Sequence, residues 1–119
     1  MPARNKQPKR FESATRREFD WDDANIGHIA EHDVTPKEAE QVILNRPVDL
    51  GSELRNGGER IAQIGETDSG RVLVVITTMS GEKVRVVTAW PANKNYRRYF
   101  ASMKRSGNVG RIEEEDFRQ

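Results

Sequence analysis

Two groups of residues in this 119-residue chain have the chemistry of a functional site, and the first is a pair of histidines. His28 and His32 are the only histidines, and they stand four residues apart in "HIAEH". On a helix this spacing places both imidazoles on one side, where they can bind zinc or move protons. A zinc site needs a third ligand, but the sequence has no cysteine, and isoleucine follows His28 where the HExxH pattern requires glutamate. We therefore expect the pair to be structural, near a helix end, and expect no metal or other cofactor.

The second group lies in "PANKNYRRYFASMKRSG", which contains cations and no acidic residue. At about 100° per residue, the cations of a helix here fall within one arc of roughly 120°. They are Lys94, Arg97, Arg98, Lys104 and Arg105, and the apolar residues Tyr96, Tyr99, Phe100 and Met103 lie opposite. Such stripes bind phosphate backbones, and the tyrosines offer stacking surfaces for bases. The alternatives are a solvated helix face and a surface that binds an acidic protein.

The predicted sheet adds charged residues of both signs. The cations are Arg60, Arg71, Lys83 and Arg85, and the acids among them are Glu59, Glu66 and Glu82. Metal-independent RNA cleavage needs a base for the 2′-hydroxyl, an acid for the leaving oxygen and cations for the charge of the phosphorane. Arginine and glutamate on adjacent strands can supply these groups, although such pairs are also ordinary stabilisers of a sheet surface.

The elements that position these residues begin with a short strand at "FDW", where apolar residues alternate around an aspartate. A helix follows, with Asp22 as its N-cap and Asp33 at its end, because aspartate tolerates the left-handed conformation there. Its expected apolar stripe is Ile26, Ile29 and Ala30.

The stretch "VTPKEA" predicts the start of a second helix. Thr35 and Glu38 have the spacing of a capping box, a proline occupies the first helical position, and Val34 and Ala39 are placed for a hydrophobic staple. This helix should bury Ala39, Val42 and Ile43 and stop before Pro47.

The remaining elements are four predicted strands, 48–54, 59–66, 71–78 and 83–90, separated by "RNGG", "DSG" and "SG" turns. "VLVVITT" is apolar on both faces and should be the central strand. A last helix is expected from about Lys94 to Lys104. The predicted fold is therefore a compact α+β domain: a short N-terminal strand, a two-helix hairpin, an antiparallel sheet of about four strands and a C-terminal amphipathic helix.

Length and composition place one domain at 19–105, between a disordered basic arm (1–18) and a flexible acidic tail (106–119). The net charge of +1 is unevenly distributed along the chain, because the arm alone carries six cations and only two glutamates. The absence of cysteine is compatible with a reducing cytoplasm. No apolar run reaches the roughly 18 residues of a membrane span, and the N-terminus lacks the apolar segment of a secretion signal.

Two long stretches resemble the BrnT-type toxins. "FDWDDANIGHIAEHDVTPKEAEQVILNRPV" is similar to their opening, in which a "WD" strand leads into a helix ending near "KHG" and then a capped helix. "ERIAQIGETDSGRVLVVITTMSGEKVRVVTAWPANKNYRRY" is similar to their sheet and closing helix. The resemblance covers roughly residues 19–100, and the ordered set is more specific than any single motif.

The resemblance implies a compact RelE-like α/β ribonuclease, the toxin of a bacterial toxin–antitoxin pair. Such a toxin arrests translation by metal-independent RNA cleavage and is neutralised by a BrnA-like antitoxin. The implied partners are that antitoxin and RNA, either free or ribosome-associated, and no membrane. The catalytic candidates are Arg71, Arg85 and Glu66, and the basic helix would hold the RNA.

The chain departs from the family pattern at several positions. Glu31 and Asp33 replace the usual Lys or Arg and Gly around His32. Trp90 stands where many members have arginine, and Tyr96 where they often have glutamate. A tryptophan before Pro91 at a strand end is more typical of packing than of catalysis. If Asn93 caps the last helix, residue 96 is its N3 position, and the family glutamate would be a capping residue. These departures keep open a second hypothesis, a non-enzymatic relative that binds protein or RNA.

Overall fold

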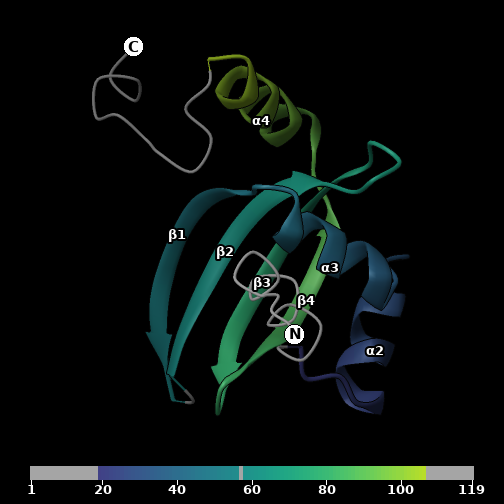
Figure 1. Cartoon of the computed structure of the whole chain (residues 1–119), viewed down its shortest axis with the longest axis vertical. Coiled ribbons are helices and arrows are strands. Elements are labelled where there is room, and N and C mark those ends of the chain that lie inside the picture. Colours follow the sequence, from purple (N-terminus) through teal and green to yellow (C-terminus); the bar gives the residue numbers. More distant parts are fainter. Residues whose placement is uncertain (1–18, 57, 107–119) are drawn as a thin grey trace, which may run out of the picture.

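The computed structural model describes residues 19–56 and 58–106, so the predicted arm 1–18 and all but the first residue of the predicted tail 106–119 lie outside the described residues. The chain order is α2 (Asp23–Ala30), α3 (Pro36–Leu44), β1 (Val48–Arg55), β2 (Gly58–Glu66), β3 (Val72–Ser80), β4 (Lys83–Pro91) and α4 (Lys94–Ser106) (Figure 1). The four strands form one antiparallel sheet in the order β1-β2-β3-β4. The α+β fold, its four antiparallel strands and its C-terminal helix are therefore confirmed.

Helix α2 begins at the predicted N-cap. The Asp22 carboxylate accepts from the Asn25 backbone N–H (3.1 Å), and the Asn25 side chain accepts in return from the Asp22 N–H (2.8 Å). The predicted apolar stripe is only partly correct, because Ile29 is buried but Ile26 (38% exposed) and Ala30 are both exposed. Asn25 is buried beside Ile29 instead, and its amide donates to the carbonyls of Asp20 and Val86. Hydrogen bonds to the backbone thus replace an apolar contact between α2 and β4.

Helix α3 has the predicted capping box. Thr35 Oγ1 accepts from the Glu38 N–H, and the Glu38 carboxylate accepts from the Thr35 N–H. Asp33 adopts the left-handed conformation (φ 64°) that separates the two helices, as expected. Val34 and Ala39 are both buried, which agrees with the predicted staple.

The sheet separates two apolar clusters. Leu73 and Val75 of β3 belong to the cluster that α2 and α3 cover, whereas Val74 between them belongs to the cluster under α4. Because neighbouring side chains of a strand point to opposite faces, the two helices and α4 lie on opposite faces. β3 lies between β2 and β4 and is apolar on both sides, so the predicted central strand is confirmed.

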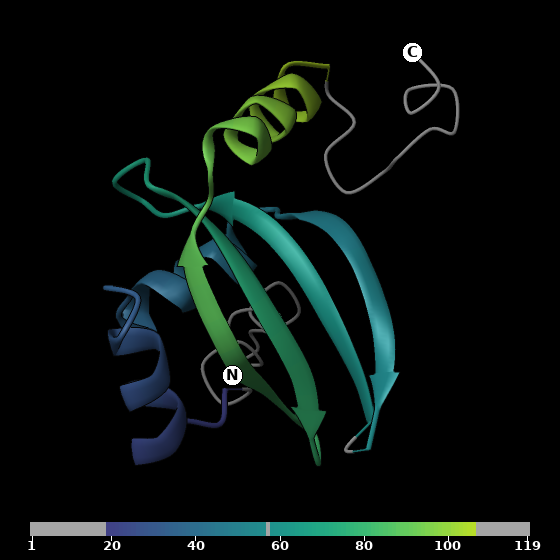
Figure 2. The ribbon, with the colours of Figure 1, turned by 180° about the vertical axis from the view of Figure 1, so that it is seen from behind.

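Helix α4 covers only one end of its face, as the view from behind shows (Figure 2). Its buried residues, Phe100 and Met103, pack with Val48, Ile64 and Val74. The rest of this face is crossed by no other described helix. At the outer edge of β4, the predicted "FDW" strand is reduced to one parallel bridge between Phe19 and Val84. Within residues 19–56 and 58–106, no helix is long and apolar enough to span a membrane.

Candidate functional site

The cations of α4 project from its solvent side. The helix starts where the Asn93 carboxamide accepts from the Tyr96 N–H (2.9 Å), so residue 96 is at the N3 position. Phe100 and Met103 are buried on one side, and the basic residues that the sequence grouped into one arc are all exposed on the other: Lys94, Arg97, Arg98, Lys104 and Arg105. The predicted amphipathic helix is thus present, with its positive charge facing solvent.

Two of these five cations have partners within the chain. Lys104 forms an ion pair with Glu66 of β2, and its Nζ lies 5.9 Å from the centre of the Phe100 ring. Arg97 donates to the carbonyl of Ala92 (2.9 Å), just before the helix. The side chains of the other three make no hydrogen bond or ion pair with any described residue: Lys94, Arg98 and Arg105. Three cations are therefore available to an external anion.

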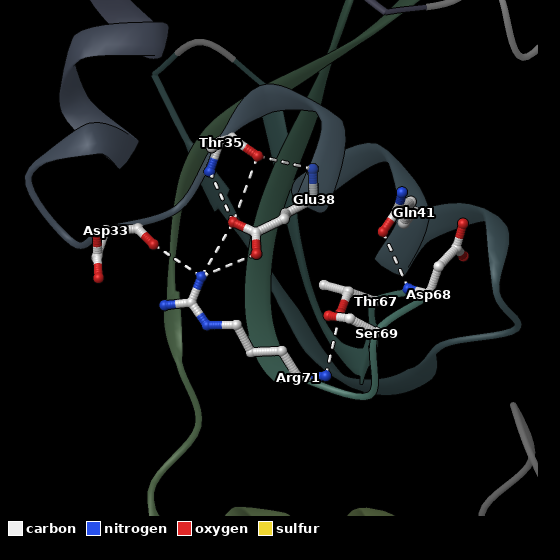
Figure 3. Close-up of polar contacts among 8 residues, drawn as sticks. All are labelled: Asp33, Thr35, Glu38, Gln41, Thr67, Asp68, Ser69 and Arg71. Atoms are coloured by element: carbon white, nitrogen blue, oxygen red, sulfur yellow. Dashed lines mark hydrogen bonds and ion pairs between the residues drawn. The ribbon is translucent and has the colours of Figure 1, made fainter.

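Arg71 connects the helical hairpin to the start of β3 (Figure 3). Its Nη1 donates to both carboxylate oxygens of Glu38 (3.0 Å each) and to the carbonyl of Asp33 (2.8 Å). Burial acts to raise the pKa of Glu38, but the hydrogen bonds from Thr35 and Arg71 outweigh it and hold this pKa below its ordinary value of 4.5. One carboxylate thus both caps α3 and binds the guanidinium, an arrangement that fixes the hairpin on the sheet.

Arg85 lies on β4 near the amino-terminal end of α2. It donates to Asp20 (3.4 Å) and to Asp22 (3.1 Å), the N-cap of that helix. The hydrogen bond from Arg85 lowers the pKa of the Asp22 carboxyl, and the same bond raises the pKa of Arg85. Like Arg71, this arginine joins a helix start to the sheet.

Glu66 occupies a third location, at the end of β2 beneath α4. Its backbone carbonyl accepts from the Asn45 carboxamide at the end of α3, and its carboxylate pairs with Lys104. Arg71 contacts Glu38 of α3, on the face of the sheet opposite to α4. Arg85 lies beside Thr78 in the strand register, and Thr78 is seven residues, or roughly 23 Å, farther along the chain than Arg71. The structure therefore does not bring the three predicted catalytic side chains together.

A groove of about 360 Å³ opens on the same face of the sheet as α4, in the part that α4 does not cover. It is lined by Gly51, Ser52, Glu53, Arg55, Arg60, Ala62, Ile76, Val87, Thr88 and Trp90. Trp90 is 36% exposed, so this residue is only partly packed, in contrast to the expectation of a packed tryptophan. Sequence reasoning noted Arg60 and Trp90 separately but missed the groove. Because alternate residues of a strand share a face, the sequence could have placed Thr88 and Trp90 together. Arg60 lies on another strand, and its place in the same groove depends on the pairing between strands, which a local sequence pattern does not specify.

The two histidines lie on the surface at the end of α2, with ring centres 6.0 Å apart in an edge-to-face arrangement. Neither belongs to the groove or to α4. Among residues 19–56 and 58–106, no three His, Asp or Glu side chains cluster as a metal site would require. Their position at the helix end is the one that a dipole interaction needs.

Comparison with known protein families identifies the class of this domain. A family model described as the BrnT ribonuclease toxin of type II toxin–antitoxin systems matches residues 21–95. The chain belongs to the BrnT toxin family. No curated protein matches it. Membership in this family supports a toxin role and implies a protein antitoxin as partner.

The BrnT match spans α2, α3, the whole sheet and the first two residues of α4. The groove residues Arg60 and Trp90 therefore lie within the matched region, as do Arg71, Arg85 and Glu66. Four of the five α4 cations follow residue 95: Arg97, Arg98, Lys104 and Arg105. The basic surface of this BrnT protein thus lies mostly outside the segment that defines the family.

Proposed function

We propose that this BrnT protein is a bacterial cytoplasmic toxin that cleaves RNA without a metal ion, inhibits translation and is neutralised by a BrnA-like antitoxin. The observation that carries this proposal is the cationic face of α4, where three of the cations have no partner in the described chain. Phosphate groups of RNA are the anions that such a face binds best, since each contact releases counterions. Family membership supplies the independent reason to expect RNA as substrate.

We assign the binding of the RNA backbone to the α4 cations, Lys94, Arg97, Arg98, Lys104 and Arg105. Glu66 is the predicted catalytic residue that lies beside them, through its pair with Lys104. In this proposal its carboxylate accepts the proton of the 2′-hydroxyl, whose oxygen then attacks the phosphorus. Lys104 stabilises the added negative charge, and the 5′-oxygen leaves with a proton from solvent. The products are a 2′,3′-cyclic phosphate and a free 5′-hydroxyl.

Arg71 and Arg85 have a different part in this scheme. Both guanidinium groups are held by carboxylates at helix starts, Glu38 for Arg71 and Asp22 for Arg85. We therefore propose that they act on cleavage indirectly, by holding the helical hairpin against the sheet. A direct role for either arginine would require it to exchange a carboxylate for the phosphorane.

A second function is favoured by the separation of the three predicted catalytic groups. In that alternative, this BrnT protein binds RNA or a protein through the basic helix and performs no cleavage. The substitution of the family arginine by Trp90 is consistent with it.

Inducible expression in a bacterial host distinguishes the two functions. The cleaving toxin should arrest growth and fragment RNA within the induction period, and co-expression of a BrnA-like antitoxin should prevent both effects. Glu66→Gln should retain RNA binding and lose fragmentation, while the matched variant Glu59→Gln, on the same strand, should behave like the parent. Growth arrest with intact RNA would instead favour the non-enzymatic alternative.

A further inference from the structure

The open groove beside α4 has the composition of a nucleotide-binding surface. Ala62 and Ile76 are cross-strand partners and form part of an apolar floor. Thr88 pairs with Ile76, and Trp90 pairs with Val74, so these residues follow one another along β4 on the same side as the floor. The groove therefore has an aromatic wall at the end near α4 and a polar rim farther along β2.

The charge of this rim is net positive. Glu53 and Arg55 neutralise each other through an ion pair (2.7 Å). Arg60 stands directly across from Glu53 in the register, but its side chain makes no hydrogen bond or ion pair with any residue that the structure describes. It is partly buried on the groove wall. A half-buried cation without a partner is a site for an anion, because desolvation strengthens its attraction.

The two tryptophans of the chain differ in a way that points to the same ligand. The Trp21 indole N–H donates to Glu40 (2.7 Å), so its polar edge is satisfied within the fold. The Trp90 indole has no hydrogen-bond partner among residues 19–56 and 58–106, and 36% of the residue is exposed on the groove. An exposed indole on a sheet face, in a groove that also contains a cation, is an arrangement on which single-stranded nucleic-acid bases stack.

We propose that this groove binds an unpaired nucleotide of single-stranded RNA, with the base stacked on the Trp90 indole and a neighbouring phosphate paired with Arg60. The two residues are separated by two strands and by four residues along them, or about 10 Å across and about 14 Å along the sheet. Both side chains line the same groove, so one single-stranded segment lying in it can contact the two. The groove would thus extend the α4 phosphate surface with a subsite that recognises a base.

This inference rests on the proposed function, because RNA is the substrate class that family membership supplies. The exposed indole, and not the charge of the groove, favours the same occupant over an acidic protein segment. An acidic segment would use the cation but would leave the indole without a flat partner, whereas a nucleotide uses both. Stacking on one aromatic residue contributes enough that its removal should weaken binding by roughly 5- to 100-fold.

The test uses a short single-stranded oligonucleotide with 2′-O-methyl groups, which binds but cannot be cleaved, and an abasic oligonucleotide of equal charge. In the full chain carrying Trp21→Phe, Trp90 is the only indole, and its fluorescence should be quenched by the first oligonucleotide and not by the second. In the otherwise native chain, Trp90→Ala should raise the Kd of the base-carrying oligonucleotide roughly 5- to 100-fold without changing the salt dependence, and Trp90→Tyr should restore most of the affinity. Arg60→Gln should lower the salt slope by about 0.7, whereas the matched variant Arg46→Asn, outside the groove, should not.

Three results would overturn the subsite: equal quenching by the abasic oligonucleotide, unchanged affinity in folded Trp90→Ala, or no binding of the oligonucleotide by the parent. Loss of antitoxin binding with intact RNA affinity in Trp90→Ala would make the groove a protein-docking surface and also overturn it. Because the oligonucleotide cannot be cleaved, the result is independent of catalysis. If the parent binds the oligonucleotide with quenching of Trp90 but never cleaves RNA, the subsite is supported and the ribonuclease proposal is contradicted. If the parent cleaves RNA but its Trp90 fluorescence is not quenched, only the subsite is contradicted.

Discussion

Replacing Lys94 and Arg98 with alanine removes two cations that lie on the exposed face of α4 and have no partner within the described chain. The buried residues Phe100 and Met103 remain, and alanine is the best helix former. Lys94 also stands in the first turn, where the positive end of the helix dipole disfavours it. The melting temperature should therefore stay the same or rise slightly.

The effect on RNA binding follows from counterion release. Each phosphate contact to single-stranded RNA contributes about 0.7 to the salt slope, so two lost contacts lower it by about 1.4. Between 50 and 200 mM salt, the affinity of the double variant should fall about 7-fold less than that of the parent. Fluorescence anisotropy with a labelled, non-cleavable oligonucleotide at several salt concentrations measures this difference.

The matched control is Lys37→Ala with Arg46→Asn, which removes the same charge from α3 and the loop after it. Asparagine suits position 46 because Arg46 has a left-handed backbone (φ 56°). The control should keep the parent's salt slope. If the α4 variant also keeps that slope and affinity, the basic face is merely solvated. If it keeps RNA affinity but loses the antitoxin, the face is a protein-docking surface.

Three further predictions concern stability and cofactor dependence. Because the pKa of Glu38 is lowered in the folded state, its contribution to stability is present above the ordinary pKa of 4.5 and is lost as the pH falls through the lower folded-state pKa. In denaturant titrations over that acid range, the Glu38→Gln variant should therefore lose less stability than the parent. An equal acid sensitivity in the two proteins would contradict this assignment. Gly65→Ala should destabilise the fold by roughly 1–3 kcal/mol in chemical denaturation, because a Cβ there would lie 3.1 Å from Val42 Cγ1 and 3.3 Å from Pro47; an unchanged midpoint would mean that α3 shifts freely. Chelator treatment should leave both the melting temperature and any RNA cleavage unchanged, and stoichiometric zinc with chelator-induced unfolding would overturn the structural reading of the histidine pair.

Local sequence signals predicted most elements of this fold. The capping residues Asp22 and Thr35 were found because a cap depends on groups three residues away. The strands predicted at 48–54, 59–66, 71–78 and 83–90 correspond to Val48–Arg55, Gly58–Glu66, Val72–Ser80 and Lys83–Pro91, since alternation and glycine turns are also short-range patterns.

The candidate site was less predictable because it depends on long-range packing. Glu38 was recognised as a capping residue, but its second partner, Arg71, is 33 residues away in the sequence. The groove needs the register of β2, β3 and β4, including an irregularity at Ile76 and Thr77 that changes the pairing. No periodicity within one strand specifies that register, so Arg60 and Trp90 could not be assigned to a common surface from the sequence.

Direct cleavage of RNA by the purified chain is the measurement that tests the proposed activity most directly. An end-labelled, single-stranded RNA is incubated with an excess of the full chain in the presence of a chelator, beside the Glu66→Gln and Glu59→Gln variants. We predict fragments ending in a 2′,3′-cyclic phosphate with the parent and with Glu59→Gln, and none with Glu66→Gln, although all three bind the RNA. Intact RNA with the folded, RNA-binding parent would contradict the assignment of this BrnT protein as a metal-independent ribonuclease.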